Sequence, residues 1–163
     1  MQFVTNPKSP SFPSSGLGTD GGFVIWLLRP MHTLTATLAI LWASPWTLFG
    51  LANGLLALAT GGRVRRHGRV LEFSGGWATF FLKTFPLVAG AAAVTFGHTV
   101  LGRNPEALNA ARSHELVHVR QYEHWGPLFV PAYLACWVVL RLRGKNPYFD
   151  NPFEREAFDE ARR

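Results

Sequence analysis

The chain has 163 residues, enough for one domain with a real core but not for two. Charged residues make up 16%, against about 25% in an ordinary soluble domain. The formal charge of +6 comes from basic residues beside apolar runs, which is typical of sequence that flanks membrane segments. Cys136 is the single cysteine, which excludes an intrachain disulfide and a zinc site built from several thiolates.

The first 62 residues divide into two segments by composition. Residues 1–22 are rich in Ser, Pro and Gly and hold too few apolar residues to fold, so we expect a disordered tail. Residues 23–62 are apolar, and residues 31–62 carry no Asp, Glu, Lys or Arg. This length exceeds the about 20 residues that cross a bilayer, and Pro45 predicts a kink or a break into two helices. We expect a transmembrane or membrane-attached segment; the alternative is a helical hairpin packed on the domain.

Basic residues follow the apolar segment at once, at Arg63, Arg65, Arg66 and Arg69. By the positive-inside tendency, this end and the domain after it would face the cytoplasm. The cluster lacks the interleaved aromatic side chains of a protein that binds single-stranded nucleic acid. We therefore expect a membrane-associated protein with no nucleic-acid partner.

Residues 63–163 predict a small domain of the α+β class. Residues 63–73 alternate polar and apolar side chains around a glycine turn, as a β-hairpin does. Residues 76–90 are apolar and are consistent with either a strand or a helix. Residues 93–102 predict a strand that ends at its last glycine.

Three helices follow in the sequence. The first covers residues 105–125 with Asn104 as its cap, unless a break near residues 109–113 divides it. The second covers residues 128–142 and is strongly apolar. The third covers residues 151–160, where an asparagine cap is followed by a proline at the first helical position.

His114, Glu115 and His118 form an HExxH motif on the first of these helices. Four residues along a helix bring both histidines to one face, where two imidazoles can bind one tetrahedral metal ion. Glu115 is placed to reach a water on the metal rather than the metal itself. We therefore expect a bound Zn²⁺ and a catalytic role for Glu115 as general base in the hydrolysis of peptide bonds.

A zinc site of this kind needs a third protein ligand. His124 stands ten residues after His114, which on an unbroken helix places it roughly 80° away and about three turns along the axis. It can reach the same metal ion only if the helix breaks. A carboxylate from the last helix is the other scheme, and Glu154 and Glu156 both satisfy it.

The HExxH motif followed by Glu154-Arg155-Glu156-Ala157 resembles the gluzincins, zinc metallopeptidases that include membrane-bound and small regulatory members. The resemblance covers roughly residues 93–160 and implies a minimal zincin-like domain, with a small antiparallel sheet, an active-site helix and a glutamate helix. It selects Glu154 as the third ligand, because the ligand glutamate in the membrane and regulatory families precedes a small residue by three. Phe158 departs from the acidic or amide residue usual after that alanine.

The resemblance also implies a peptide or protein substrate that pairs with an edge strand over residues 93–101. It implies an oxyanion-stabilising side chain, for which Tyr148, His98 and Tyr122 are the candidates. The alternative function is a non-catalytic membrane protein whose motif holds a structural metal ion or none. The sequence indicates no particular oligomeric state.

Overall fold

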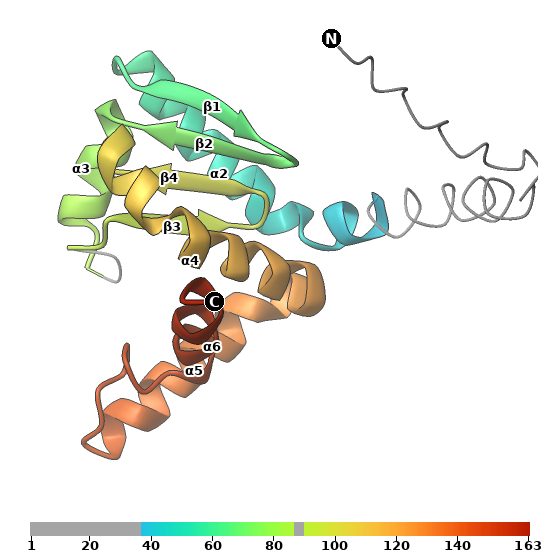
Figure 1. The fold of residues 1–163 in the computed structure, drawn as a ribbon, viewed down its shortest axis with the longest axis vertical. Coiled ribbons are helices and arrows are strands. Elements are labelled where there is room, and N and C mark those ends of the chain that lie inside the picture. Colours follow the sequence, from blue (N-terminus) through green and yellow to red (C-terminus); the bar gives the residue numbers. More distant parts are fainter. Residues whose placement is uncertain (1–36, 87–89) are drawn as a thin grey trace, which may run out of the picture. The chain divides into compact units, whose positions relative to one another are not determined.

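The computed structural model describes residues 37–86 and 90–163. The tail predicted over residues 1–22 and the start of the apolar segment lie outside the described residues. What is described belongs to one compact unit, which begins at Thr35. It is an α+β fold with a four-stranded sheet and helices on both faces (Figure 1).

The strands follow the order β1-β2-β4-β3 across the sheet. β1 (Arg63–His67) pairs antiparallel with β2 (Val70–Ser74), which confirms the predicted hairpin. β3 (Ala93–Phe96) and β4 (Thr99–Gly102) form a second hairpin, so the single strand predicted over this region is wrong. Gly97 stands in the turn with a φ of 59°, a conformation that glycine adopts without strain.

The centre of the sheet is parallel, which corrects the purely antiparallel sheet expected from the sequence. β2 and β4 run in the same direction, with Leu71 opposite Thr99. A parallel pair needs a long crossover connection, which α3 (Gly76–Thr84) and β3 provide. The sequence of residues 76–90 was consistent with either a strand or a helix. The described part of this region is mainly helical.

α2 (Ser44–Ala59) packs against the sheet on the same face as α3 (Figure 1). It begins beside Pro45, where a break was predicted, after a helical stretch over residues 37–42. A Cβ atom on Gly50 would lie 2.7 Å from Cβ of Thr99, and one on Gly54 would lie 2.6 Å from the ring of Phe73. This close approach shows that the second half of the predicted apolar segment packs on the sheet.

α4 (Pro105–Trp125) covers the opposite face of the sheet and is continuous through residues 109–113. Asn104 caps it as predicted. Arg112 donates two hydrogen bonds, at 2.7 and 2.9 Å, to the buried carboxylate of Glu72 on β2. This ion pair holds α4 in register on the sheet.

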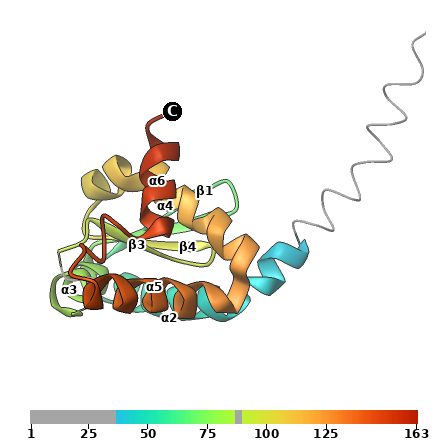
Figure 2. The same ribbon diagram turned by 90° about the horizontal axis from the view of Figure 1, so that it is seen from below.

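The chain turns after α4 through the short helix η1 (Gly126–Leu128) into α5 (Phe129–Leu142). α6 (Pro152–Ala161), capped by Asn151, then packs back against α4. Figure 2 shows α2, α3 and α5 along one side of the molecule, with α4 and α6 on the other. The predicted helices of the C-terminal half are thus confirmed, and α4 and α6 are brought together.

Among the described residues, the helical stretch Pro105–Leu142 is long and apolar enough to cross a membrane, judged by length and composition. Only 11% of its most apolar window is buried, whereas a helix in a soluble core is mostly buried. The stretch turns at Gly126, so its apolar part is essentially α5. α2, at 16 residues, falls short of the about 20 that span a bilayer. Residues 23–36 lie outside the described residues, so the transmembrane segment predicted over residues 23–62 stays a prediction, and the stretch of membrane length among the described residues is Pro105–Leu142.

Candidate metal centre

Three predicted metal ligands meet where α6 packs on α4. His114 and His118 lie one turn apart on α4, and Glu154 comes from the first turn of α6. Nε2 of His114 lies 3.0 Å from Oε2 of Glu154 and 3.1 Å from Nε2 of His118. Nε2 of His118 lies 3.5 Å from Oε1 of Glu154. His118 and Glu154 are buried, and the side chain of His114 is 13% exposed.

The donor atoms lie close enough together to share one metal ion. Zinc binds imidazole nitrogen and carboxylate oxygen at about 2.0–2.2 Å, which places neighbouring donor atoms roughly 3.3 Å apart. The two Nε2 atoms lie 3.1 Å apart, and each lies near a different oxygen of Glu154, at 3.0 and 3.5 Å. Both imidazoles present Nε2 to the carboxylate of Glu154. The three side chains could fill three of the four positions around a tetrahedral metal ion. The cluster of His114, His118 and Glu154 can therefore hold a metal ion.

The electrostatics of the cluster favour a cation at this point. Burial raises the pKa of Glu154, but its hydrogen bonds with His114 and His118 outweigh burial and lower the pKa to about 2. Burial lowers the pKa of His118, but the hydrogen bond to Glu154 and the charge of Glu115 raise it to about 9. Glu154 is thus held as an anion against a positive partner, and a divalent metal ion would supply that positive charge instead of a proton.

Gln121 fixes the orientation of His118. Its Oε1 accepts a hydrogen bond from Nδ1 of His118 at 2.7 Å, which leaves Nε2 for the metal. Its Nε2 donates to the carbonyl oxygen of Phe153 at 3.0 Å and to Oε2 of Glu156 at 2.8 Å. Glu156, the alternative third ligand, therefore binds Gln121 and lies outside the cluster of metal-ligating groups.

Tyr133 and Phe158 support the other two ligands. Tyr133 donates a hydrogen bond to Oε1 of Glu154 at 2.9 Å and so orients the carboxylate. Nδ1 of His114 is buried without a hydrogen-bond partner among the described residues. The ring of Phe158 packs on the His114 ring instead, with 4.7 Å between centroids. The contact that the structure shows for the His114 ring on this side is therefore apolar.

We expect Gln121→Ala to bind zinc about 10–100-fold more weakly than the wild type, because it removes the partner that orients a ligating histidine. Competition with a chromophoric zinc chelator measures this affinity. Glu106→Ala, at an exposed position in the first turn of the same helix, is the matched control and should bind zinc normally. An unchanged affinity in a folded Gln121→Ala protein would show that His118 needs no such partner.

Glu115 lies between the ligands and the sheet. It is 6% exposed, and Oε2 accepts a hydrogen bond from Oγ1 of Thr95 on β3 at 2.7 Å. Burial raises the pKa of Glu115, and the charge of His118 and the hydrogen bond from Thr95 oppose that rise. A buried carboxylate with a raised pKa is suited to accept a proton from water and pass it on.

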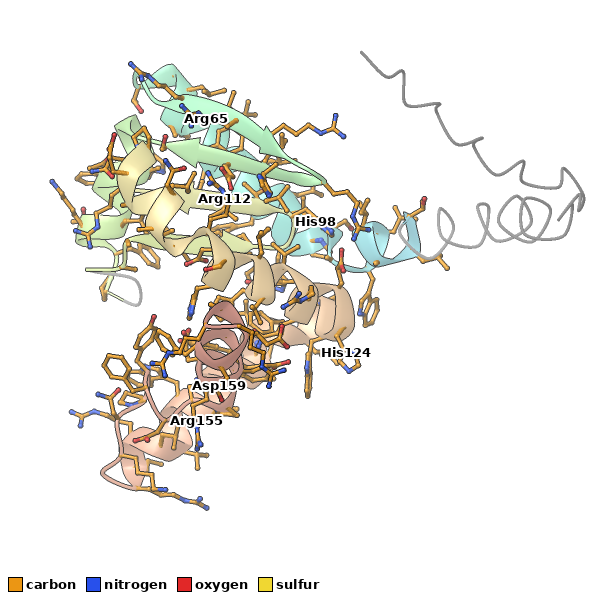
Figure 3. All side chains as sticks on the ribbon, viewed as in Figure 1. Arg65, His98, Arg112, His124, Arg155 and Asp159 are labelled. Atoms are coloured by element: carbon orange, nitrogen blue, oxygen red, sulfur yellow. The ribbon has the colours of Figure 1, made fainter. Side chains whose placement is uncertain are left out.

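The other histidine candidates, His98 and His124, are both labelled in Figure 3. His124 is exposed in the last turn of α4, beside Trp125, as the geometry of an unbroken helix predicts. His98 is buried in the turn between β3 and β4, and its Nε2 lies 3.0 Å from Oε1 of Glu123. Neither belongs to the group of residues that can hold a metal ion.

Two cavities meet at the ligands. An apolar cavity of about 710 Å³ is lined by His118 and Glu154 at one end. A smaller cavity of about 310 Å³ is lined by His114 and Glu115. Tyr148 lines both and is 42% exposed, whereas the buried Tyr122 donates its hydroxyl to the carbonyl of a β3 residue. A substrate that extends from one cavity to the other would pass the metal ligands.

Comparison of the chain with known protein families, curated proteins and solved structures finds no match. The resemblance to the gluzincins therefore rests on the motif residues themselves.

Proposed function

We propose that the chain is a zinc metallopeptidase that hydrolyses peptide bonds at a membrane surface. The observation that carries the proposal is the convergence of His114, His118 and Glu154 from two helices, with Glu115 buried beside them. Zinc held there would lower the pKa of a coordinated water to about 7 and polarise the scissile carbonyl. That chemistry requires a base next to the ligands, and Glu115 is the carboxylate in that place.

The side chains around the cluster have distinct tasks in the proposed reaction. Glu115 accepts a proton from the attacking water and later delivers it to the nitrogen of the leaving amine. Thr95 holds the carboxylate of Glu115 by its 2.7 Å hydrogen bond and so directs the base. Gln121 and Tyr133 keep their ligands in place, which preserves the geometry of the reacting groups.

Tyr148 is the proposed donor to the oxyanion. It lines both cavities at the ligands. Tyrosine keeps its proton at neutral pH, and burial, followed by the charges of Glu154 and Glu115, raises the pKa of Tyr148 further. A protonated phenol at this place can donate a hydrogen bond to the negative oxygen that develops during hydrolysis. His98 and Tyr122, the other candidates, have their polar groups engaged elsewhere.

We expect Tyr148→Phe to lower kcat by about 10²–10³-fold while zinc content is unchanged, because it removes one oxyanion donor. Steady-state hydrolysis of a quenched peptide gives kcat and KM separately. Lys145→Ala, at an exposed position in the same loop, controls for disturbance of the loop. A kcat equal to that of the wild type would remove Tyr148 from the reaction.

Membrane association is supported by apolar side chains exposed on α2 and α5, which lie on one side of the molecule (Figure 2). These are Leu48, Leu55, Leu56, Val138, Val139 and Leu142. α5 has 14 residues and so extends about 21 Å, less than the about 30 Å of a bilayer core. We therefore propose that these helices lie at the lipid interface, where their exposed apolar side chains contact the bilayer. The cytoplasmic location expected from the basic residues after the apolar segment stays a prediction.

The proposal is tested by hydrolysis of a peptide library with zinc-loaded wild type and zinc-loaded Glu115→Gln. Cleavage by the wild type alone supports the enzyme. Zinc bound by both proteins without cleavage by either would support the alternative, a membrane protein with a structural metal site.

A further inference from the structure

The larger cavity is apolar along most of its wall. The ionisable side chains among its described lining residues are three tyrosines and the ligands His118 and Glu154. The rest of the wall is mainly aromatic and aliphatic, from α2, α3, β3 and α5. Its volume of about 710 Å³ lies within the range of about 300–1,000 Å³ typical of ligand pockets. Such a cavity favours apolar groups, since a charge placed in it would lose its hydration.

The rim of this cavity reaches the apolar side of the molecule. Phe49 of α2 and Phe85 at the end of α3 both line the cavity, yet they are 43% and 48% exposed. Leu48 and Phe80, on the same two helices, are exposed as well. α2 and α3 lie on the side where α5 also exposes apolar side chains (Figure 2). Phe49 and Phe85 thus belong both to the cavity wall and to the surface proposed to face lipid.

The inner end of the cavity consists of groups that act on a polypeptide. His118 and Glu154 lie there, and Thr95 of β3 lies beside them. β3 is an edge strand of the sheet, and an edge strand can bind an extended peptide through main-chain hydrogen bonds. A polypeptide thus finds both main-chain partners and the reacting groups, whereas a lipid chain would use neither.

We propose that the substrate is an apolar stretch of polypeptide that enters from the membrane side between Phe49 and Phe85. This inference rests on the proposed peptidase function and names its substrate class. The apolar side chains of the substrate occupy the larger cavity, and the scissile amide lies at His118 and Glu154. Soluble polar peptides are poor substrates, because their side chains would be dehydrated in the cavity without hydrogen-bond partners.

The test uses the zinc-loaded full chain in phospholipid vesicles and two quenched peptides that differ only in a run of leucines or serines beside the scissile bond. We expect kcat/KM for the leucine peptide to exceed that for the serine peptide by at least about 10-fold. Phe49→Ser and Phe85→Ser should lower kcat/KM for the leucine peptide. Phe80→Ser changes a side chain that is exposed on α3 but does not line the cavity, so it should leave kcat/KM unchanged.

The other possible results separately contradict the apolar substrate class, the role of the cavity and the peptidase function. Equal hydrolysis of both peptides leaves the peptidase in place and removes the apolar substrate class. A loss of activity in Phe80→Ser equal to that in Phe85→Ser would assign the effect to membrane contact rather than to the cavity. Competition by a free long-chain fatty acid, with no preference between the peptides, would assign the cavity to lipid. No hydrolysis of either peptide, with zinc bound, removes the peptidase function itself.

Discussion

Glu115→Gln should lower kcat for peptide hydrolysis by about 10²–10⁴-fold while the protein keeps its zinc. The amide retains the size of the carboxylate and can still bond to Thr95, whose hydroxyl lies 2.7 Å from Oε2. It cannot accept a proton from water at neutral pH. Steady-state kinetics together with zinc analysis of the same preparation gives both quantities.

Glu106→Gln is the matched control for this variant. It makes the same chemical change on α4, in an exposed first turn away from the ligands. The control should hydrolyse peptide at the wild-type rate. Wild-type activity in Glu115→Gln would mean that a different group accepts the proton.

His118→Ala and Glu154→Ala should each lose zinc and activity together. Each leaves two of the three protein ligands, and the loss should exceed the about 10–100-fold expected when only a supporting residue is removed. Elemental analysis after dialysis against buffer without chelator measures the zinc that remains. The effect is expected to be large because each variant removes an atom that binds the metal ion directly, whereas Gln121 only orients one of the ligands.

The same experiment decides between the candidate third ligands. Glu156→Ala and His124→Ala change residues outside the cluster and should retain zinc. Full zinc in Glu154→Ala with loss in Glu156→Ala would exchange the roles of the two glutamates and contradict the site described here.

The helix boundaries at the site follow from local sequence. Asn104 and Asn151 precede prolines, and a side-chain cap before proline at the first position is a short-range signal. The spacing of His114 and His118 then determines that both lie on one face of α4. These features were predicted because each depends on only a few neighbouring residues.

The pairing of the strands depends on residues far apart and was predicted less well. Val94 and Thr95, like Thr99 and Val100, are β-branched, so the whole segment resembles one strand. Gly97 is the signal that divides this segment into two strands. A glycine followed by one further residue can form a two-residue hairpin turn. The parallel pairing of β2 with β4 has no local signal at all.

Some of the residues that support the site have a local signal in the sequence, and others have none. Gln121 stands three residues after His118, a spacing that places both on one helix face, so the sequence did contain that signal. Thr95 and Tyr133 reach the site from β3 and α5, and nothing in their neighbourhood indicates it. The apolar cavity combines residues from α2, α3, β3, α4, α5 and α6, so it follows only from the fold.

X-ray absorption at the zinc edge of the purified full chain tests the central claim most directly. The account predicts about one zinc per chain, with two imidazole nitrogens at about 2.0–2.1 Å, carboxylate oxygen at about 2.0–2.2 Å and no sulfur. A sulfur shell at about 2.3 Å would place the metal at Cys136, and a chain that retains no zinc would leave the HExxH residues without a metal. Either result would contradict a centre built from His114, His118 and Glu154.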